Sequence, residues 1–269
     1  MLFNWGIEAW KWKILVKHIE NISFLTAFKG ILAGVSLAIN TPNRVGEYFG
    51  RIIYIKEGNR LRAISLTVVG SMSQLIITVI FGLFGLIFLR HFLSNTTEAP
   101  LGLSLLWINI IIYGSAGLSA VLLLVYYRLS FLIRLIEKIP FVARYVYFIQ
   151  KLEEFEWREL SAILLLSMFR YSVFIMQYVL LLQVFDVNIG WWESSWLTFV
   201  MFLIMAVVPT IALAELGLRG QVSLLLFGLM SSNTLGIVLT ASGIWLINLV
   251  VPAMAGSLFI LGVKFFRSK

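Results

Sequence analysis

A glutamate followed by an arginine four residues later occurs twice in the sequence, each time soon after a proline. The first copy consists of Pro42, Glu47 and Arg51, and the second of Pro209, Glu215 and Arg219. Residues four apart share one face of a helix, so each glutamate can pair with its arginine. Proline-interrupted apolar segments at matching places in two halves of a chain are the sequence pattern that points to a transporter's substrate site. The two halves of this chain are therefore predicted to form an inverted repeat.

Several of these charges lie in apolar stretches, where they are costly. Glu215 and Arg219 follow 21 uncharged residues and precede 44, and Arg170 interrupts another apolar stretch. An ionised side chain at the centre of a bilayer costs at least about 2.5–3.5 kcal/mol on insertion scales, and such residues usually have a function or a partner. The predicted substrate-binding residues are Arg44, Glu47, Arg51, Arg170, Glu215 and Arg219.

The same residues have plainer interpretations, which the sequence leaves open. Arg44 extending to the membrane surface is one, and an ordinary exposed pair of Glu47 with Arg51 is another. Arg170 as a counter-ion to one of the glutamates is a third. Without Arg51, the set holds three arginines and two glutamates, which leaves one net positive charge. The expected ligand is therefore a membrane lipid with an anionic head group.

The composition is that of a membrane protein. Of the 269 residues, 60% are hydrophobic and 13% are charged, whereas soluble domains hold about 45–50% apolar and about 25% charged residues. The absence of cysteine excludes thiol chemistry, and 2 histidines are too few for a histidine-based metal centre. No metal, cofactor or catalytic residue is predicted.

The basic residues are placed as in a membrane protein and not as in a nucleic-acid-binding protein. Of the 21 lysines and arginines, 17 lie in residues 1–30, 51–62, 128–158 and 264–269, and the alternate loops carry only Arg90. Basic residues stay preferentially on the cytoplasmic side of a membrane. The two basic loops and the C-terminus are therefore predicted to be cytoplasmic.

Apolar runs predict an all-α, polytopic bundle that forms a single transmembrane domain over 1–269. A helix needs about 20 residues to cross a bilayer. The six predicted crossings are about 63–89, 101–127, 160–185, 194–213, 215–231 and 235–263.

Shorter or more polar segments are predicted to enter the membrane partly or to lie on it. Residues 30–43 are only 14 uncharged residues, so a re-entrant hairpin is predicted over 24–56, with Thr41 as a cap and Pro42 in the first turn of its second half. A helix on the inner membrane surface is predicted over 5–20, and an amphipathic cytoplasmic loop over 128–158.

The motifs around these charges resemble those of a known family. The resemblance is carried by Thr41-Pro42-Asn43-Arg44-Val45-Gly46-Glu47 with Arg51, by Phe169-Arg170-Tyr171 with Gln177, and by Pro209 through Arg219. They are similar to the flippase-like family typified by the transmembrane region of lysylphosphatidylglycerol synthase, from about Trp5 onward. Members usually carry further N-terminal spans, which this chain is expected to lack, and a Pro-Gly-Gly-like lead where it has Pro209-Thr210-Ile211-Ala212.

The resemblance implies a multi-pass protein of the bacterial inner membrane that moves or handles an anionic, aminoacylated or isoprenoid-linked lipid. No soluble aminoacyl-transferase domain is expected, so lysyl transfer is not implied. The predicted function is lipid translocation between leaflets, with a homo-oligomer left open. Two alternatives are an enzyme that uses Glu47 or Glu215 as a general base in glycosyl transfer or hydrolysis, and a scaffold whose charges lock helices together.

Overall fold

The computed structural model describes residues 1–39, 41–94, 105–137 and 150–267. This part of the chain is helical and holds no strand, which confirms the predicted all-α class. The helices are α1 (Leu2–Val16), α2 (Phe24–Ala38), α3 (Gly46–Ile52), α4 (Arg60–Ser94), α5 (Leu105–Tyr127), α6 (Leu129–Glu137), α9 (Trp157–Val184), α10 (Trp191–Val207), α11 (Ala212–Phe227), α12 (Thr234–Trp245) and α13 (Val251–Arg267).

Four helical segments in the described ranges are long and apolar enough to cross a membrane. They are Glu57–Ser94, Leu105–Tyr127, Trp157–Val184 and Thr234–Gly262. Each overlaps one predicted crossing, and the architecture is a polytopic helical membrane bundle, as predicted. Residues 101–104 of the predicted second crossing and 138–149 of the predicted cytoplasmic loop lie outside the described residues.

The two other predicted crossings form a hairpin of shorter helices. The apolar run was predicted to cross over 194–213, but α10 ends at Val207 and α11 begins at Ala212. Pro209 has no N–H to donate, and it forces Val208 into an extended conformation (φ −86°, ψ 113°), which ends the helix. At 1.5 Å per residue, the 17 residues of α10 are short of the roughly 30 Å apolar core of a bilayer.

A second hairpin consists of α2 and α3, within the predicted re-entrant segment 24–56. The Thr41 hydroxyl donates to Ala38 O at 3.2 Å and accepts from Gly46 N at 2.8 Å, so one side chain links the end of α2 to the start of α3. Pro42 begins a 3₁₀ turn, Pro42–Arg44, that lies between the two helices. The Thr41 side chain thus reaches the first residue of α3, but it makes no cap hydrogen bond to the 3₁₀ turn that it precedes. Pro42 lies in that turn and not, as predicted, in the first turn of the second helix.

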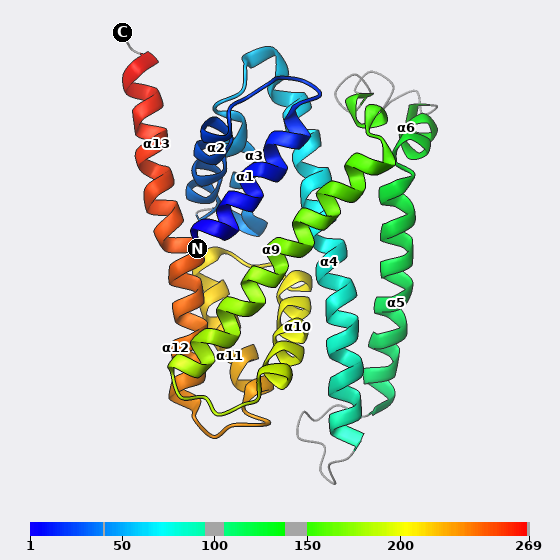
Figure 1. The fold of residues 1–269 in the computed structure, drawn as a ribbon, viewed down its shortest axis with the longest axis vertical. Coiled ribbons are helices and arrows are strands. Elements are labelled where there is room, and N and C mark those ends of the chain that lie inside the picture. The colour runs from blue at the N-terminus through cyan, green and yellow to red at the C-terminus, as the bar shows by residue number, and fades with distance from the viewer. Residues whose placement is uncertain (40, 95–104, 138–149, 268–269) are drawn as a thin grey trace.

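The two hairpins enter the molecule from opposite ends and point toward each other (Figure 1). The α2–α3 hairpin occupies the upper half of the view and the α10–α11 hairpin the lower half, with both connecting turns near mid-height. Helices α4 and α9 pass beside both hairpins. The two proline motifs of the sequence therefore lie at the facing turns.

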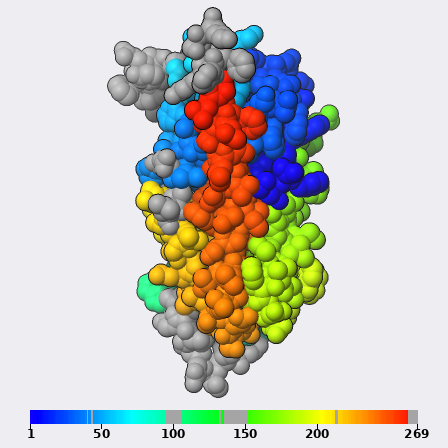
Figure 2. Space-filling model, turned by 90° about the vertical axis from the view of Figure 1, so that its left-hand side faces the viewer, coloured from blue at the N-terminus to red at the C-terminus, as the bar shows by residue number. Residues whose placement is uncertain are grey.

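Helices α12 and α13 form one column that borders both halves. A π-helical turn, Leu246–Val250, joins them. In Figure 2 this column runs along the molecule, with its upper part beside the N-terminal helices and its lower part between α11 and α9. A Cβ atom at Gly256 would overlap the backbone of Leu32, so α13 packs directly against α2.

Helix α1, predicted on the membrane surface, packs within the bundle against α2, α4 and α9. Trp5, Ala9, Trp12 and Leu15 are buried in one hydrophobic cluster. The mixture of tryptophan and lysine indicated a surface helix, but Trp5 and Trp12 point into the protein. Its other face exposes Leu2, Phe3 and Trp10.

Several of the predicted basic segments lie toward one end of the molecule. The turn after α3, the start of α9 and the C-terminal end of α13 all lie in the upper part of Figure 1. Arg90, near the end of α4, lies at the opposite end. The fold is thus polarised in charge along its long axis.

Candidate functional site: a charged cavity between two hairpins

Glu47 holds two arginines at the α2–α3 turn. Its Oε1 lies 2.8 Å from Arg44 and its Oε2 lies 3.1 Å from Arg51. The Arg51 side chain is 4% exposed, whereas that of Arg44 is 40% exposed and borders a cavity. Arg44 has φ 58°, in the left-handed region that only glycine enters without strain. Strained residues of this kind cluster at ligand sites and switches.

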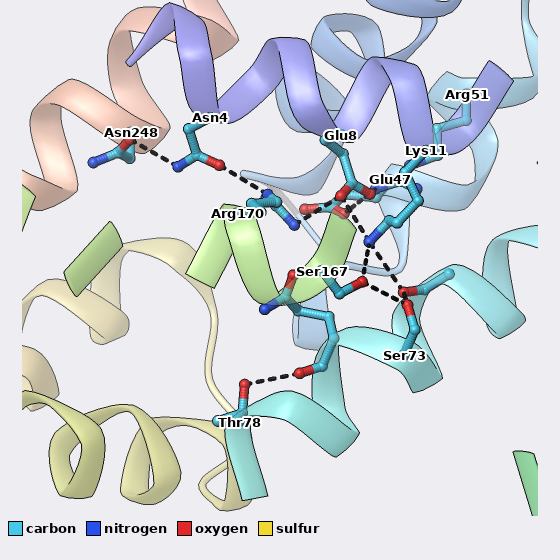
Figure 3. A network of polar contacts seen from close by, with 12 residues as sticks. Asn4, Glu8, Lys11, Glu47, Arg51, Ser73, Thr78, Ser167, Arg170 and Asn248 are labelled. Carbon is cyan, nitrogen blue, oxygen red and sulfur yellow. Dashed lines mark hydrogen bonds and ion pairs between the residues drawn. The ribbon is translucent and has the colours of Figure 1, made fainter. Parts of the chain in front are cut away.

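Glu8 of α1 joins this turn to α9, a role that sequence reasoning missed. Glu8 Oε1 lies 2.9 Å from Arg51, and Oε2 lies 2.9 Å from Lys11 and 3.0 Å from Arg170 (Figure 3). The Glu8 and Lys11 side chains are 2% and 1% exposed. Their spacing was the available signal: Asn4, Glu8 and Lys11 form a polar stripe at helical period beside an apolar stripe.

The Lys11 ammonium also donates hydrogen bonds to two uncharged oxygens. Its Nζ donates to Gly70 O at 3.2 Å and to Ser167 Oγ at 3.3 Å. Ser73 Oγ and Ser167 Oγ are 2.7 Å apart, so the hydroxyls tie α4 to α9 beneath the lysine. Three helices therefore share the site of one buried cation.

Arg170 is the cation that links this network to the cavity. Its Nη1 pairs with Glu8, and its Nε donates to Asn4 Oδ1 at 2.8 Å. Asn4 Nδ2 in turn donates to Asn248 Oδ1 at 3.3 Å, and Asn248 lies in the π-helical turn. Such turns often occur at functional sites. Arg170 also lies over the rings of Trp5 and Phe174, at 5.2 and 5.4 Å.

The second glutamate–arginine pair lies on α11, just after the α10–α11 turn. Arg219 donates to Glu215 Oε1 at 2.6 Å, as the spacing of four residues predicts. The Arg219 guanidinium also lies over the ring of Phe202 on α10, 5.9 Å from its centroid. No further ion pair to Glu215 or Arg219 occurs among the described residues.

One cavity of about 530 Å³ brings the two halves of the site together. Its volume is in the range of small-molecule sites, about 300–1,000 Å³. Of the predicted residues, Arg44, Arg170, Glu215 and Arg219 line it. Glu47 and Arg51 do not line the cavity. They hold Arg44 and Glu8 in place.

Some polar groups of the cavity-lining residues have no hydrogen-bond acceptor. In the described part of the chain these are Arg44 Nε, Arg219 Nε, Trp5 Nε1 and the Tyr171 hydroxyl, and these atoms are buried behind the lining and not open to the cavity. The charged side chains that line the cavity are Arg44, Arg170, Arg219 and Glu215.

Among the described residues, no group of three or more His, Cys, Asp or Glu side chains could hold a metal ion. The chemistry that the site offers is therefore that of guanidinium, indole and hydroxyl donors. Guanidinium groups recognise carboxylate and phosphate through planar, often bidentate hydrogen bonds.

These features define a polytopic helical membrane protein in which two opposed helical hairpins meet at a charged cavity. A family model described as "Lysylphosphatidylglycerol synthase TM region" matches residues 1–258. The chain therefore belongs to this family, which confirms the resemblance seen in the sequence. Comparisons with curated proteins and with solved structures found no match.

Proposed function

We propose that this protein translocates a lipid with an anionic head group between the two leaflets of a membrane. The observation that carries the proposal is the single cavity lined by Arg44, Arg170 and Arg219, between hairpin turns that approach from opposite ends. Membership of a family described by a lipid synthase's membrane region agrees with a lipid ligand.

The barrier to lipid translocation is the transfer of a charged head group through the apolar core of the bilayer. A cavity with preformed donors substitutes for the water that the head group loses. Glu47, Glu8 and Glu215 stabilise the arginines while the cavity is empty. The facing hairpins provide two elements that can each open toward one leaflet, which is how paired repeats act in many transporters.

We further propose that the protein lies in the bacterial inner membrane with its basic end in the cytoplasm. The charge polarity of the fold supports this orientation, because lysine and arginine are enriched in cytoplasmic loops. In this orientation the end of α13 and the connection between α6 and α9 face the cytoplasm.

Reconstitution tests the proposal. The purified full chain is placed in lipid vesicles, and the crossing of lipids labelled on the head group is followed by their accessibility to an added quencher. We expect Glu215→Gln and Arg219→Gln to reduce crossing to the rate of protein-free vesicles. Arg158→Gln, at the start of α9 and outside the cavity, is the matched control. Lipid should cross the vesicle membrane at the same rate with this variant as with the unmodified protein. Unchanged crossing in both cavity variants would contradict the proposal.

The same preparation separates the two alternatives. A scaffold predicts that the exchanged pair Glu215→Arg with Arg219→Glu behaves as the unmodified protein, because only the attraction between the two matters. A transporter predicts that the exchanged pair loses lipid crossing, because the cation no longer has the same position in the cavity. A cleaved or newly glycosylated lipid, detected by mass spectrometry, would instead favour an enzyme.

A further inference from the structure

The charge balance of the cavity and its buried network is more positive than the sequence had indicated. The described network contains three carboxylates, Glu8, Glu47 and Glu215. It contains five cations: Lys11, Arg44, Arg51, Arg170 and Arg219. The excess is two positive charges, compared with the single one expected from the sequence. The difference arises from Arg51, which is buried in the network, because the charges of Lys11 and Glu8, which α1 adds, cancel.

One of the three carboxylates in the described network lines the cavity. Glu8 contacts three cations and Glu47 contacts two, and neither lines the cavity. Glu215 does line it, and its Oε1 accepts from Arg219. A cationic amine on a head group would thus meet three arginines and a single carboxylate that already pairs with Arg219 through one oxygen.

The arginines of the lining favour an acceptor with many oxygens. Arg44 lies at the α2–α3 turn, Arg219 lies on α11 and Arg170 lies on α9, and all three line the cavity. A terminal phosphate has three strong acceptor oxygens and carries about −1.5 to −2 charges at neutral pH. A phosphodiester has two free oxygens and one charge. The terminal phosphate therefore matches both the three arginines and the charge excess.

A second, apolar groove lies beside the cavity. This groove of about 200 Å³ is lined mainly by apolar side chains of α4, α9 and α10, among them Phe81, Ile175, Val179 and Phe199. Tyr171 lines both the groove and the cavity, and its buried side chain separates the two. That the phosphate belongs to a lipid therefore rests on the proposed function and not on this groove.

We propose that the head group held in the cavity is a phosphate monoester of a long-chain lipid, bound as the dianion, and not a phosphodiester or an aminoacylated head group. This inference rests on the proposed function and narrows it to one substrate class. Its basis is the two-charge excess together with three arginines that line one cavity with a single carboxylate.

Equilibrium binding to the purified full chain in mixed micelles tests the inference. The probes are phosphatidic acid, phosphatidylglycerol and lysylphosphatidylglycerol with identical acyl chains, and inorganic phosphate, followed by tryptophan fluorescence because Trp5 lines the cavity. At pH 8 we expect phosphatidic acid to bind at least about tenfold more tightly than phosphatidylglycerol, which corresponds to about 1.4 kcal/mol. Lysylphosphatidylglycerol should bind most weakly.

Two changes sharpen the measurement. The preference for phosphatidic acid should shrink at pH 5.5, because the second proton of a phosphate monoester is lost only near pH 6 or above. Arg219→Gln should reduce the preference, and Arg158→Gln should leave it unchanged. The comparison of lipids on the unmodified protein remains decisive if the Arg219 variant fails to fold.

Equal or tighter binding of phosphatidylglycerol or of lysylphosphatidylglycerol at pH 8 would overturn the inference. If inorganic phosphate displaces bound phosphatidic acid at equal concentration, the cavity binds free phosphate, and the conclusion that the ligand is a lipid is wrong. Lipid crossing without a preference for phosphatidic acid leaves the proposed function standing and removes the inference. Selective binding of phosphatidic acid without any lipid crossing supports the head-group class and removes the proposed function.

Discussion

The two hairpins carry the same glutamate–arginine spacing, but they are packed very differently. In the α2–α3 hairpin, Cβ atoms at Gly46 or Gly50 would overlap the backbone of α2. In α11, Gly217 and Gly220 have no atom of a neighbouring element within 4 Å of such a Cβ. The first pair is joined to α1 and α9 through Glu8, whereas the second has no other ion pair among the described residues.

The difference in packing indicates that the two hairpins have different roles. Segments with few packed contacts open locally at low free energy, and ligand-binding elements that move are drawn from them. We expect the α2–α3 hairpin to act as the fixed wall of the cavity and the first turns of α11 as its adjustable wall. Four predictions test this comparison.

The largest effect on stability is expected from Glu8, the carboxylate of α1 that binds Arg51 in the fixed wall. Glu8→Gln leaves Lys11, Arg51 and Arg170 without their shared anion, and removing one partner of a buried ion pair costs about 3–5 kcal/mol. Glu215→Gln should lower stability less, because a single cation bordering the cavity loses its partner. Unfolding in mixed micelles measures both variants. Equal losses would contradict the comparison.

Glycine substitutions give the next largest difference. Gly50→Ala places a methyl group against the backbone of Gly34, and overpacking of this kind costs about 1–3 kcal/mol. Gly217→Ala meets open space and improves helix propensity, so its stability should rise by up to about 1 kcal/mol. Thermal unfolding of the two alanine variants side by side gives the answer. A destabilised Gly217→Ala protein would show that α11 is packed more tightly than described.

A smaller effect is expected at Arg44, where side-chain loss and backbone strain can be separated. Both Arg44→Ala and Arg44→Gly remove the ion pair to Glu47, but only glycine adopts φ 58° without strain. The left-handed conformation costs about 1–2 kcal/mol for other residues. The glycine variant should therefore be more stable than the alanine variant by about this amount. Equal unfolding midpoints would remove the argument for strain at the turn.

The last prediction concerns motion and involves no change in stability. Amide hydrogen exchange should be faster in 212–220 than in 46–52. Addition of a lipid ligand should slow exchange in 212–220 and leave 46–52 nearly unaffected. Mass spectrometry of peptic fragments measures both segments in one sample. Slower exchange in 212–220 than in 46–52 without ligand would reverse the assignment of the two walls.

Local sequence chemistry predicted much of the fold. The uncharged runs in α4 and α5, and the apolar stretch of α9 that only Arg170 interrupts, are long enough that hydropathy alone places them in a membrane. Thr41 and Pro42 predicted the turn between α2 and α3, because capping and proline geometry act within a few residues. The spacing of Glu215 and Arg219 predicted their contact for the same reason.

Features that depend on tertiary packing were not predicted. Hydropathy does not separate a full crossing over 194–213 from a shorter helix that ends before Pro209, because the residues on both sides of the proline are apolar. Glu8 and Lys11 were missed, since a helix with alternating tryptophan and lysine satisfies the pattern of a surface helix equally well. Asn248 gave no signal either, because the π-helical turn around it has no characteristic residue.

That π-helical turn has a consequence for how the two halves are coupled. A π-turn holds about one more residue than an α-turn, so it rotates everything beyond it by roughly 100° about the helix axis. Ile244 and Asn248 border the cavity below α13, while Gly256 further along lies directly against Leu32. Deleting one residue in Leu246–Val250 would restore a regular helix and turn Gly256 away from α2. The extra residue therefore sets the rotation about the helix axis between the side chains that line the cavity and the glycine that contacts the fixed hairpin.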